Sequence, residues 1–373
     1  MENSDSKFKK GFQYFKSVLM KTTNGMAIGL FGTLIIGTVF GLFGKIPGAF
    51  GTSMDSFAKI LQGLMGAGIG LGVALSLKRN GITAVVLMAA GFIGNYCFDW
   101  VGLKSQFEVI QIGDPLSCYV SVMLSALALK YIMQKKTPVD LILIPLVGLT
   151  IAIAYSFLLA EWVHYVTIGI QKLIQLSFSA VPFLMCIIVS CLMGMALTAP
   201  ISSVAICVAI SIGAVTIGGV NSTIPAAAAL IGCCTQMVGF AIHTAHDNKW
   251  GSVLAVGLGT SMLQFKNIVR KPLIWLPTII VSMILGPFAL LFPQISEFKE
   301  GTANTLSVGA GMGTCGLVGP INFMSAYDFN WIVLIEIIGF AILASGILVF
   351  LFDLLFRKVG WIKPGDFSLK NEE

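Results

Sequence analysis

The sequence predicts an all-α polytopic membrane protein. Of its 373 residues, 56% are hydrophobic and only 11% are charged, and the mean hydropathy is +0.91. Because soluble domains carry about 25% charged residues, this composition indicates an integral membrane protein. From Leu173 to His246 the chain contains no Asp, Glu, Lys or Arg. At about 20 residues per crossing, that stretch accommodates about three membrane-spanning helices.

The first half predicts a basic surface segment followed by five crossings. Lys9, Lys10, Lys16 and Lys21 lie among apolar residues, so residues 1–24 are predicted to form a cytoplasmic amphipathic segment on the membrane. The apolar run that follows is too long for a signal-peptide core and lacks a cleavage-like motif, so we expect it to remain as an anchor. The five crossings are predicted at 25–44, 57–77, 82–98, 116–132 and 141–160.

The charged residues predict which side faces the cytoplasm. Lysines and arginines gather on the side of the amino terminus, and acidic residues gather on the other side, with Lys104 as the main exception. The basic set is Lys78, Arg79, Lys130, Lys135 and Lys136, and the acidic set is Asp99, Glu108, Asp114 and Glu161. All six tryptophans, Trp275 among them, lie near segment ends, as an interfacial aromatic belt requires.

The second half predicts a hinge, five more crossings and one hairpin. Apolar residues at helical spacing predict that residues 161–179 form an interfacial helix between the two halves. Residues 180–356 then complete about ten spans, with a re-entrant hairpin at 305–325, and residues 357–373 form a cytoplasmic tail. Both termini are therefore expected in the cytoplasm. The five later crossings are predicted at 180–197, 201–218, 224–242, 273–292 and 331–356.

The predicted hairpin rests on the composition of residues 309–323, Gly-Ala-Gly-Met-Gly-Thr-Cys-Gly-Leu-Val-Gly-Pro-Ile-Asn-Phe. Glycine lets the backbone approach a ligand closely, whereas proline removes an amide donor and breaks a helix. Broken segments at membrane depth occur where they are surrounded by protein or line a cavity, and in transporters they mark the binding site. The alternative is a glycine-rich loop outside the membrane.

The same residues carry a family resemblance. Residues 316–323, Gly-Leu-Val-Gly-Pro-Ile-Asn-Phe, resemble the Gly-Ile-Thr-Glu-Pro-Ile-Glu-Phe signature of the membrane-embedded IIC subunits of the sugar phosphotransferase system. Residues 309–319 and 257–264 are similar to a divergent IIC-like group that includes perfringolysin-regulator-like proteins. Gly319 stands where typical sugar permeases have a glutamate that binds sugar hydroxyls, and Asn322 replaces the second acid.

What the resemblance implies is a glucose-superfamily IIC-like architecture. Residues 25–160 would form a scaffold through which two copies make a homodimer, and residues 180–356 would carry substrate between the two faces. Separate IIA and IIB phosphocarrier proteins would be partners if phosphotransfer is retained. The chain itself has no room for a separate phosphorylated domain, so its own enzymatic role is left open.

Uncharged polar side chains concentrate in the second half. A polyol must exchange hydrogen bonds with water for hydrogen bonds with protein, so its site needs such donors and acceptors. The alternative is that they join helices, at about 0.6–2 kcal/mol per hydrogen bond. A short echo between residues 197–203 and 317–323 predicts two facing broken elements. The candidate substrate-binding residues are Thr198, Ser202, Ser203, Asn221, Gln236, His243, Thr314, Gly319, Asn322 and Glu336.

Two of these candidates are titratable. His243, with His246, falls at the cytoplasmic end of the eighth crossing, where it would gate, bind substrate or simply lie at the interface. Glu336 lies inside an apolar run, either as a functional carboxylate or as a side chain that reaches the outer interface. The eight cysteines form no CxxC pair and predict free thiols. No catalytic residue, metal site or cofactor is predicted.

The function predicted from these observations is a multi-pass cell-membrane permease for a sugar or sugar-like small polar metabolite. One alternative is a membrane sensor or regulator that kept the IIC fold. Another is a permease for a non-sugar small molecule that is uncoupled from phosphotransfer. The net charge of +6 follows from basic cytoplasmic loops, so no nucleic-acid partner is predicted.

Overall fold

The computed structural model describes residues 18–19, 21–44, 46, 48–79, 81–98, 109–111, 113–133, 138–217, 220–295 and 302–369. The predicted amphipathic segment up to residue 17 and the end of the tail from residue 370 lie outside these residues, as do several charged loop residues, among them Lys104, Glu108 and Lys135. Within the described residues the elements are helices, apart from two short antiparallel hairpins. The predicted all-α class is confirmed.

The chain folds as two compact units. One contains the residues up to Leu34 together with Ile60–His164 and Phe265–Lys271, and the other contains Ile35–Lys59, Tyr165–Gln264 and the chain from Pro272 onward. Residues 35–59, which the sequence grouped with the first half, therefore belong to the second unit.

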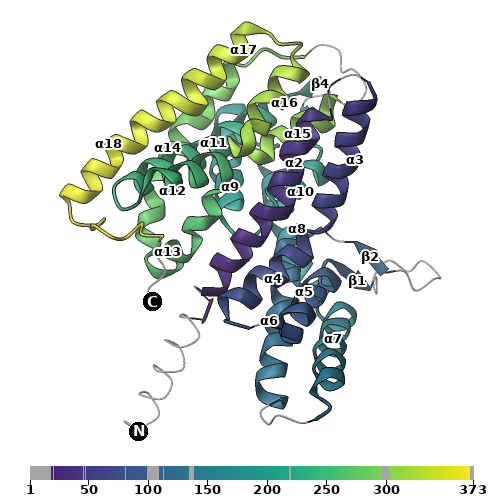
Figure 1. Cartoon of the computed structure of the whole chain (residues 1–373). Helices are drawn as coiled ribbons and strands as arrows, with labels where there is room; N and C mark the ends of the chain where they lie inside the picture. The colour runs from purple at the N-terminus through teal and green to yellow at the C-terminus, as the bar shows by residue number, and fades with distance from the viewer. Residues whose placement is uncertain are drawn as a thin grey trace. The chain divides into compact units, whose positions relative to one another are not determined.

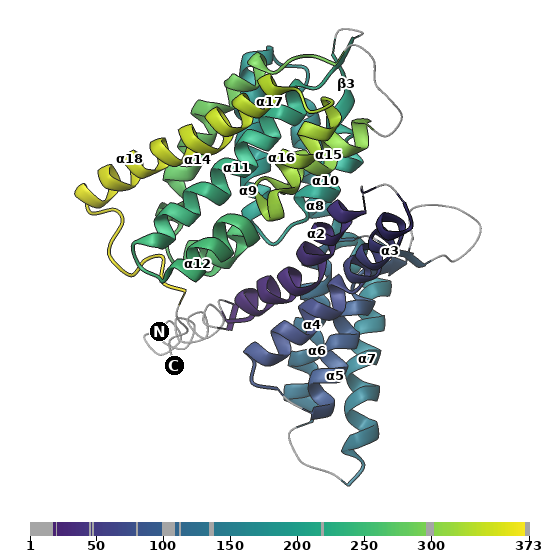
Figure 2. The ribbon, with the colours of Figure 1, turned by 45° about the horizontal axis from the view of Figure 1, so that its top comes forward.

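In the first unit, helices α4 (Met65–Ser76), α5 (Gly81–Ile93), α6 (Pro115–Ile132) and α7 (Asp140–Leu158) lie side by side (Figure 2). Glycines allow the closest approach: a Cβ added at Gly70 would lie 2.8 Å from the Met88 Cα of α5. Asp114 begins α6 by accepting a hydrogen bond from the Leu116 amide at 2.9 Å, which satisfies a free N–H of the first turn. Strands β1 (Tyr96–Phe98) and β2 (Val109–Gln111) pair antiparallel beside these helices.

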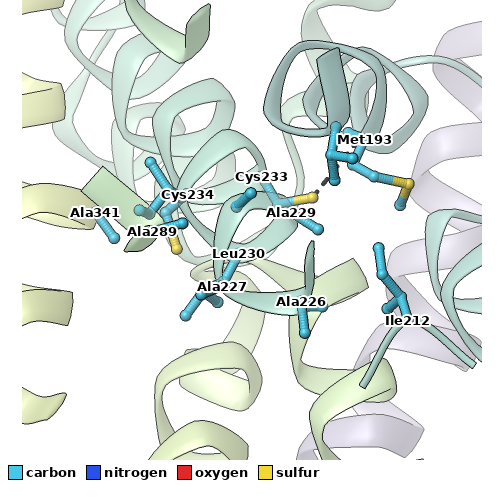
Figure 3. Packing of buried hydrophobic residues seen from close by; sticks show 14 of the residues in the cluster. Met193, Ile212, Ala226, Ala227, Ala229, Leu230, Cys233, Cys234, Ala289 and Ala341 are labelled. Carbon is cyan, nitrogen blue, oxygen red and sulfur yellow. Dashed lines mark hydrogen bonds between the residues drawn. The ribbon is translucent and has the colours of Figure 1, made fainter. Parts of the chain in front are cut away.

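The second unit is built around α11 (Ile224–Ala245), which packs against α9 (Pro182–Thr198), α14 (Leu276–Leu285) and α18 (Ser345–Lys358) (Figure 1). A helix that is apolar on every face is a buried one, and small residues let its neighbours approach closely. The side chains of Ala226–Leu230 are fully buried on α11, and the Cys233 thiol donates to the Met193 carbonyl at 3.5 Å (Figure 3).

The remaining elements complete the two units. Helices α17 (Trp331–Glu336), η8 (Ile337–Ala344) and α18 form one continuous helix, Trp331–Lys358. Strands β3 (Val215–Ile217) and β4 (Val220–Ser222) form the second hairpin. The other elements are η1 (Phe31–Ile35), α2 (Ile36–Phe43), α3 (Ala49–Gly63), α8 (Ala160–Ser177), α10 (Ser203–Ala209), η2 (Ile212–Ala214), α12 (Trp250–Leu254), η3 (Ala255–Gly259), η4 (Ser261–Gln264), α13 (Phe265–Arg270), η5 (Pro272–Trp275), η6 (Gly286–Leu291), α15 (Thr302–Met312), η7 (Cys315–Leu317), α16 (Val318–Ala326), α17 (Trp331–Glu336) and η8 (Ile337–Ala344).

Among the described residues, six helices are long and apolar enough to cross a membrane, and a seventh span results if α3 and α4, bent by 48°, count as one. The six are Lys21–Phe43, Pro115–Ile132, Asp140–Leu158, Ile224–Ala245, Pro272–Leu291 and Trp331–Lys358. Four shorter apolar helices, including Gly81–Ile93 and Pro182–Thr198, accompany them. About ten spans, and the interfacial position of α8, stay predictions.

One predicted crossing, residues 201–218, is not a continuous helix and is corrected here. Helix α10 has only seven residues and is followed by η2 and the β3–β4 hairpin. Ser211 adopts a left-handed conformation with φ +50°, which ends the helix. The β-branched run Val215–Ile217 before Gly218 and Gly219 then favours a strand and a turn, a signal that the overall hydropathy concealed.

Candidate functional site

Two interrupted helical elements lie at the places where the sequence predicts them. Helix α9 ends at Thr198, and α10 begins after Ser202, whose hydroxyl accepts a hydrogen bond from the Ala205 amide at 3.2 Å. Helices α15 and α16 pack together as a helical hairpin at the predicted position. Its turn contains Gly313 and Gly316 at φ +54° and +52°, conformations that glycine adopts without steric cost. Entry of this hairpin into the membrane stays a prediction.

The two interrupted elements touch each other. The Ser203 hydroxyl donates to the Gly311 carbonyl of α15 at 2.7 Å. A Cβ added at Gly311 would lie 2.7 Å from the Val204 Cα, so only glycine permits this approach. The first echoed sequence, residues 197–203, runs from the end of α9 to the first residue of α10, and the second, residues 317–323, covers the N-cap and first turns of α16.

The hairpin is tightly packed at residue 319, the position that resembles the glutamate of typical sugar permeases. The Gly319 amide donates to the Gly313 carbonyl at 3.1 Å, and a Cβ at residue 319 would overlap that carbonyl and lie 2.8 Å from a Leu230 methyl group. Asn322 is 4% exposed and packs against Gly309 of the facing arm. Both positions therefore face protein at the hairpin, and a longer side chain at residue 319 requires the backbone to move.

A cluster of uncharged polar side chains lies beside α11. The Gln236 Oε1 accepts hydrogen bonds from Trp275 Nε1 and Thr278 Oγ1, both at 3.0 Å, and from Thr198 Oγ1 at 3.4 Å. Ser261 Oγ lies 3.0 Å from Thr198 Oγ1. We call these five residues the Gln236 cluster. Because an indole N–H only donates, Trp275 identifies which end of the Gln236 amide is the oxygen.

The other end of that amide lacks a partner. Gln236 is fully buried, and its Nε2 makes no hydrogen bond to any residue in the described part of the chain. A buried donor without a partner costs about 1–3 kcal/mol. The cluster therefore offers two unused N–H donors, in surroundings that contain hydroxyl groups and no charge.

The segment 257–261 connects the hairpin turn to this cluster. Thr314 Oγ1 donates to the Gly257 carbonyl at 2.7 Å, and Ser261 of the same segment contacts Thr198. Gly313 packs against the backbone of Cys233, about one helical turn before Gln236 on α11. Thr198, Gln236 and Thr314 are thus brought into one region.

Three other predicted residues lie apart from the cluster. His243 bonds instead to Asp353, near the carboxyl end of α11. Glu336 is 8% exposed at the end of α17, and its Oε2 makes no hydrogen bond to a described residue. Asn221 lies in β4, opposite Thr216, and its side chain is outside the described part.

Sequence reasoning missed three members of the cluster. Trp275 was assigned to the interfacial belt, yet its indole bonds a buried glutamine. Ser261 lies within residues 257–264, which carried part of the family resemblance and thus did supply a signal. Thr278 had none, because only the packing of α14 against α11 brings it to Gln236.

A buried charged network was also missed. The Asp353 carboxylate lies 2.7 Å from His243 Nδ1, 2.7 Å from Arg357 Nε and 3.4 Å from His246 Nε2. Asp353 is fully buried, so its charge depends on these partners. An acid four residues before an arginine in an apolar helix was the available signal.

The eight cysteines are free thiols, as predicted. Within the described residues no group of three or more histidine, cysteine or acidic side chains is placed to hold a metal ion.

Comparison with known proteins adds the family. The family model described as "Phosphotransferase system, EIIC" matches residues 20–369, nearly the whole chain. No curated protein and no solved structure matched. This match supports a permease-type role in the phosphotransferase system, and the apolar helices agree with a multi-pass membrane protein. The chain therefore belongs to the EIIC family of the phosphotransferase system.

Proposed function

We propose that this EIIC-family chain is a permease for a sugar or sugar-like polar metabolite, and that the Gln236 cluster forms part of its substrate site. The observation that carries the proposal is the buried Gln236 Nε2, which has no hydrogen-bond partner among the described residues, although the Oε1 of the same amide bonds Thr198 and Thr278. A polyol hydroxyl accepts a hydrogen bond from such a donor and donates one to a neighbouring oxygen. A polyol would therefore satisfy both the amide donors and the hydroxyl oxygens of the cluster.

A purely structural role explains the cluster less well. Side chains that only join helices pair their polar atoms with each other, because an unpaired group in an apolar region is costly. Here the Gln236 oxygen lies within hydrogen-bond distance of three donor groups, while the nitrogen of the same amide has no partner in the described structure. An acceptor oxygen of a ligand would satisfy this nitrogen.

The tight packing at Gly319 limits which groups of the hairpin can recognise substrate. The family implies sugar substrates and IIA and IIB phosphocarrier partners in general. Since Gly319 leaves no room for a side chain, we propose that amide and hydroxyl dipoles replace the usual glutamate. The same observation favours, as a second candidate, a chain that kept the fold but not phosphotransfer: a sensor, or a permease for a non-sugar molecule.

The Gln236→Leu variant tests the site. We expect it to weaken ligand binding by about 1–3 kcal/mol, roughly 5- to 150-fold, because substrate hydroxyls lose the amide donors. A thermal-shift screen of monosaccharides and polyols on the purified parent identifies the ligand, and titration then compares the variants. Asn322→Ala should weaken binding by a similar amount if the hairpin also contributes.

The control is Asn304→Ala, which changes an exposed residue on α15. Parent-like affinity in the Gln236 variant would place the site elsewhere. A parent that binds none of the sugars or polyols would instead support the second candidate.

We also propose that both termini face the cytoplasm and that residues 25–160 form a homodimer interface, as the lysine and arginine distribution and the family resemblance suggest. Cysteines introduced at residue 10 and after residue 358 should be protected from an impermeant thiol reagent in intact cells. Cysteines introduced within 25–160 should cross-link two copies. External labelling of either end, or cross-links formed only through 273–356, would contradict this arrangement.

A further inference from the structure

The chain after α18 turns back onto the second unit (Figure 1). Gly360, at φ +82°, follows the end of the helix, and the Ile362 amide donates to the Phe356 carbonyl at 3.2 Å. Gly365, at φ +90°, makes a second turn, after which Phe367 is fully buried. These two turns bring residues 363–369 into contact with the second unit.

Two side chains at the end of α11 bind the backbone of this segment. Asn248 donates from Nδ2 to the Phe367 carbonyl and accepts at Oδ1 from the Leu369 amide, both at 2.8 Å. Asp247 Oδ2 accepts from the Phe367 amide at 3.0 Å. Each polar backbone group of Phe367 therefore has a partner, much as in a strand pair.

An aromatic socket holds the Phe367 side chain. Its ring stacks on His243, with the ring centres 4.5 Å apart and the planes 2° from parallel, and it meets Phe240 edge-on at 6.4 Å. His243 is held in turn by Asp353 through Nδ1 at 2.7 Å. The socket is thus built on α11 and oriented by α18, the helix from which the segment emerges.

The same segment is bonded to the element that reaches the Gln236 cluster. Gln264 Nε2 donates to the Phe367 carbonyl at 3.0 Å and to Thr244 Oγ1 at 2.7 Å. Gln264 is the last residue of η4, whose first residue, Ser261, contacts Thr198 in the cluster. Fixing Phe367 therefore restrains one end of η4, and the other end of η4 contacts the cluster.

We propose that residues 363–369 are a latch that holds segment 257–264 against the Gln236 cluster and the hairpin turn, and that its release opens this region. The interpretation of this opening as a route for substrate rests on the proposed function. The restraint of segment 257–264 by residues 363–369 is tested without a substrate.

Two native thiols report on the opening. Cys233 lies on α11 against Gly313, and Cys315 directly follows Thr314, and both are buried. Two other buried thiols serve as references. Cys118 belongs to the first unit, and Cys186 lies near the start of α9, about three helical turns before Thr198. In the purified full-length protein, alkylation by N-ethylmaleimide is followed at each cysteine by mass spectrometry.

The variants Phe367→Ala and Asn248→Ala should raise the labelling rates of Cys233 and Cys315 by about tenfold, because each removes contacts that hold the latch closed. The rates at Cys118 and Cys186 should stay at the parent value. Matched controls are Phe350→Ala, at an exposed phenylalanine of α18, and Asn304→Ala. Both controls should label like the parent.

Unchanged labelling of Cys233 and Cys315 in both latch variants would overturn the proposal. An equal rise at all four cysteines would also overturn it, because the segment would then stabilise the whole fold and not the one region. Either result leaves the Gln236→Leu binding test intact, so failure of the latch and failure of the proposed substrate site are distinguishable.

Discussion

Replacing Asp353 by alanine is expected to lower the free energy of unfolding by about 3–5 kcal/mol. The fully buried carboxylate bonds His243 Nδ1 and Arg357 Nε, each at 2.7 Å. Without it, a guanidinium group and an imidazole are left in apolar surroundings with their partner removed. Denaturant titration of the detergent-purified protein, followed by tryptophan fluorescence, measures the loss.

Asp55→Ala is the matched control. Asp55 also pairs with a cation four residues on, Lys59 at 2.6 Å, but the two side chains are 48% and 73% exposed. Solvent screens such a pair, so we expect a change of about 0.5 kcal/mol or less. Equal losses in the two variants would show that burial of the Asp353 network has no special effect on stability.

Gly232→Ala is expected to destabilise the protein by about 3 kcal/mol. A Cβ at this position on α11 would lie 2.6 Å from the Ser190 carbonyl carbon and 2.7 Å from its Cα on α9. These are backbone atoms, so the contact is relieved only by separating two packed helices. The same denaturant titration measures the effect.

The control for this variant has the opposite expected sign. Gly169, on α8, has no atom within 4 Å of an added Cβ. Alanine in a helix is better than glycine by about 0.5–1 kcal/mol, so Gly169→Ala should be neutral or stabilising. A Gly232→Ala variant as stable as the parent would contradict the close packing of α9 on α11.

Much of the helical organisation could be predicted from local patterns. Three long helices were recognisable from their apolar runs: Pro115–Ile132, Ile224–Ala245 and Trp331–Lys358. A buried or lipid-facing helix needs little more than length and hydrophobicity. The glycines and proline of 309–323 likewise predicted a hairpin, since their backbone preferences act over a few residues. The short strand signal at 215–217 was hidden by its apolar surroundings.

The candidate site was only partly accessible from the sequence. Thr198, Gln236 and Thr314 were identified because uncharged polar residues stand out in an apolar stretch. Which of them meet was not predictable, because Thr198 and Gln236 are joined across α9 and α11 and receive Ser261, Trp275 and Thr278 from later elements. Such contacts depend on how helices pack, and no local spacing encodes them.

By itself, the sequence determined the all-α membrane class and the place of the hairpin, and it carried the motif of the EIIC family, because each depends on composition or on residues adjacent in the chain. Only the tertiary structure decided that Gly319 has no space for a side chain, that Asp353 bonds His243 and Arg357, and that Phe367 packs against α11. The reason is physical: close approach and hydrogen-bond pairing are properties of two surfaces together, and either sequence segment alone specifies only one of them.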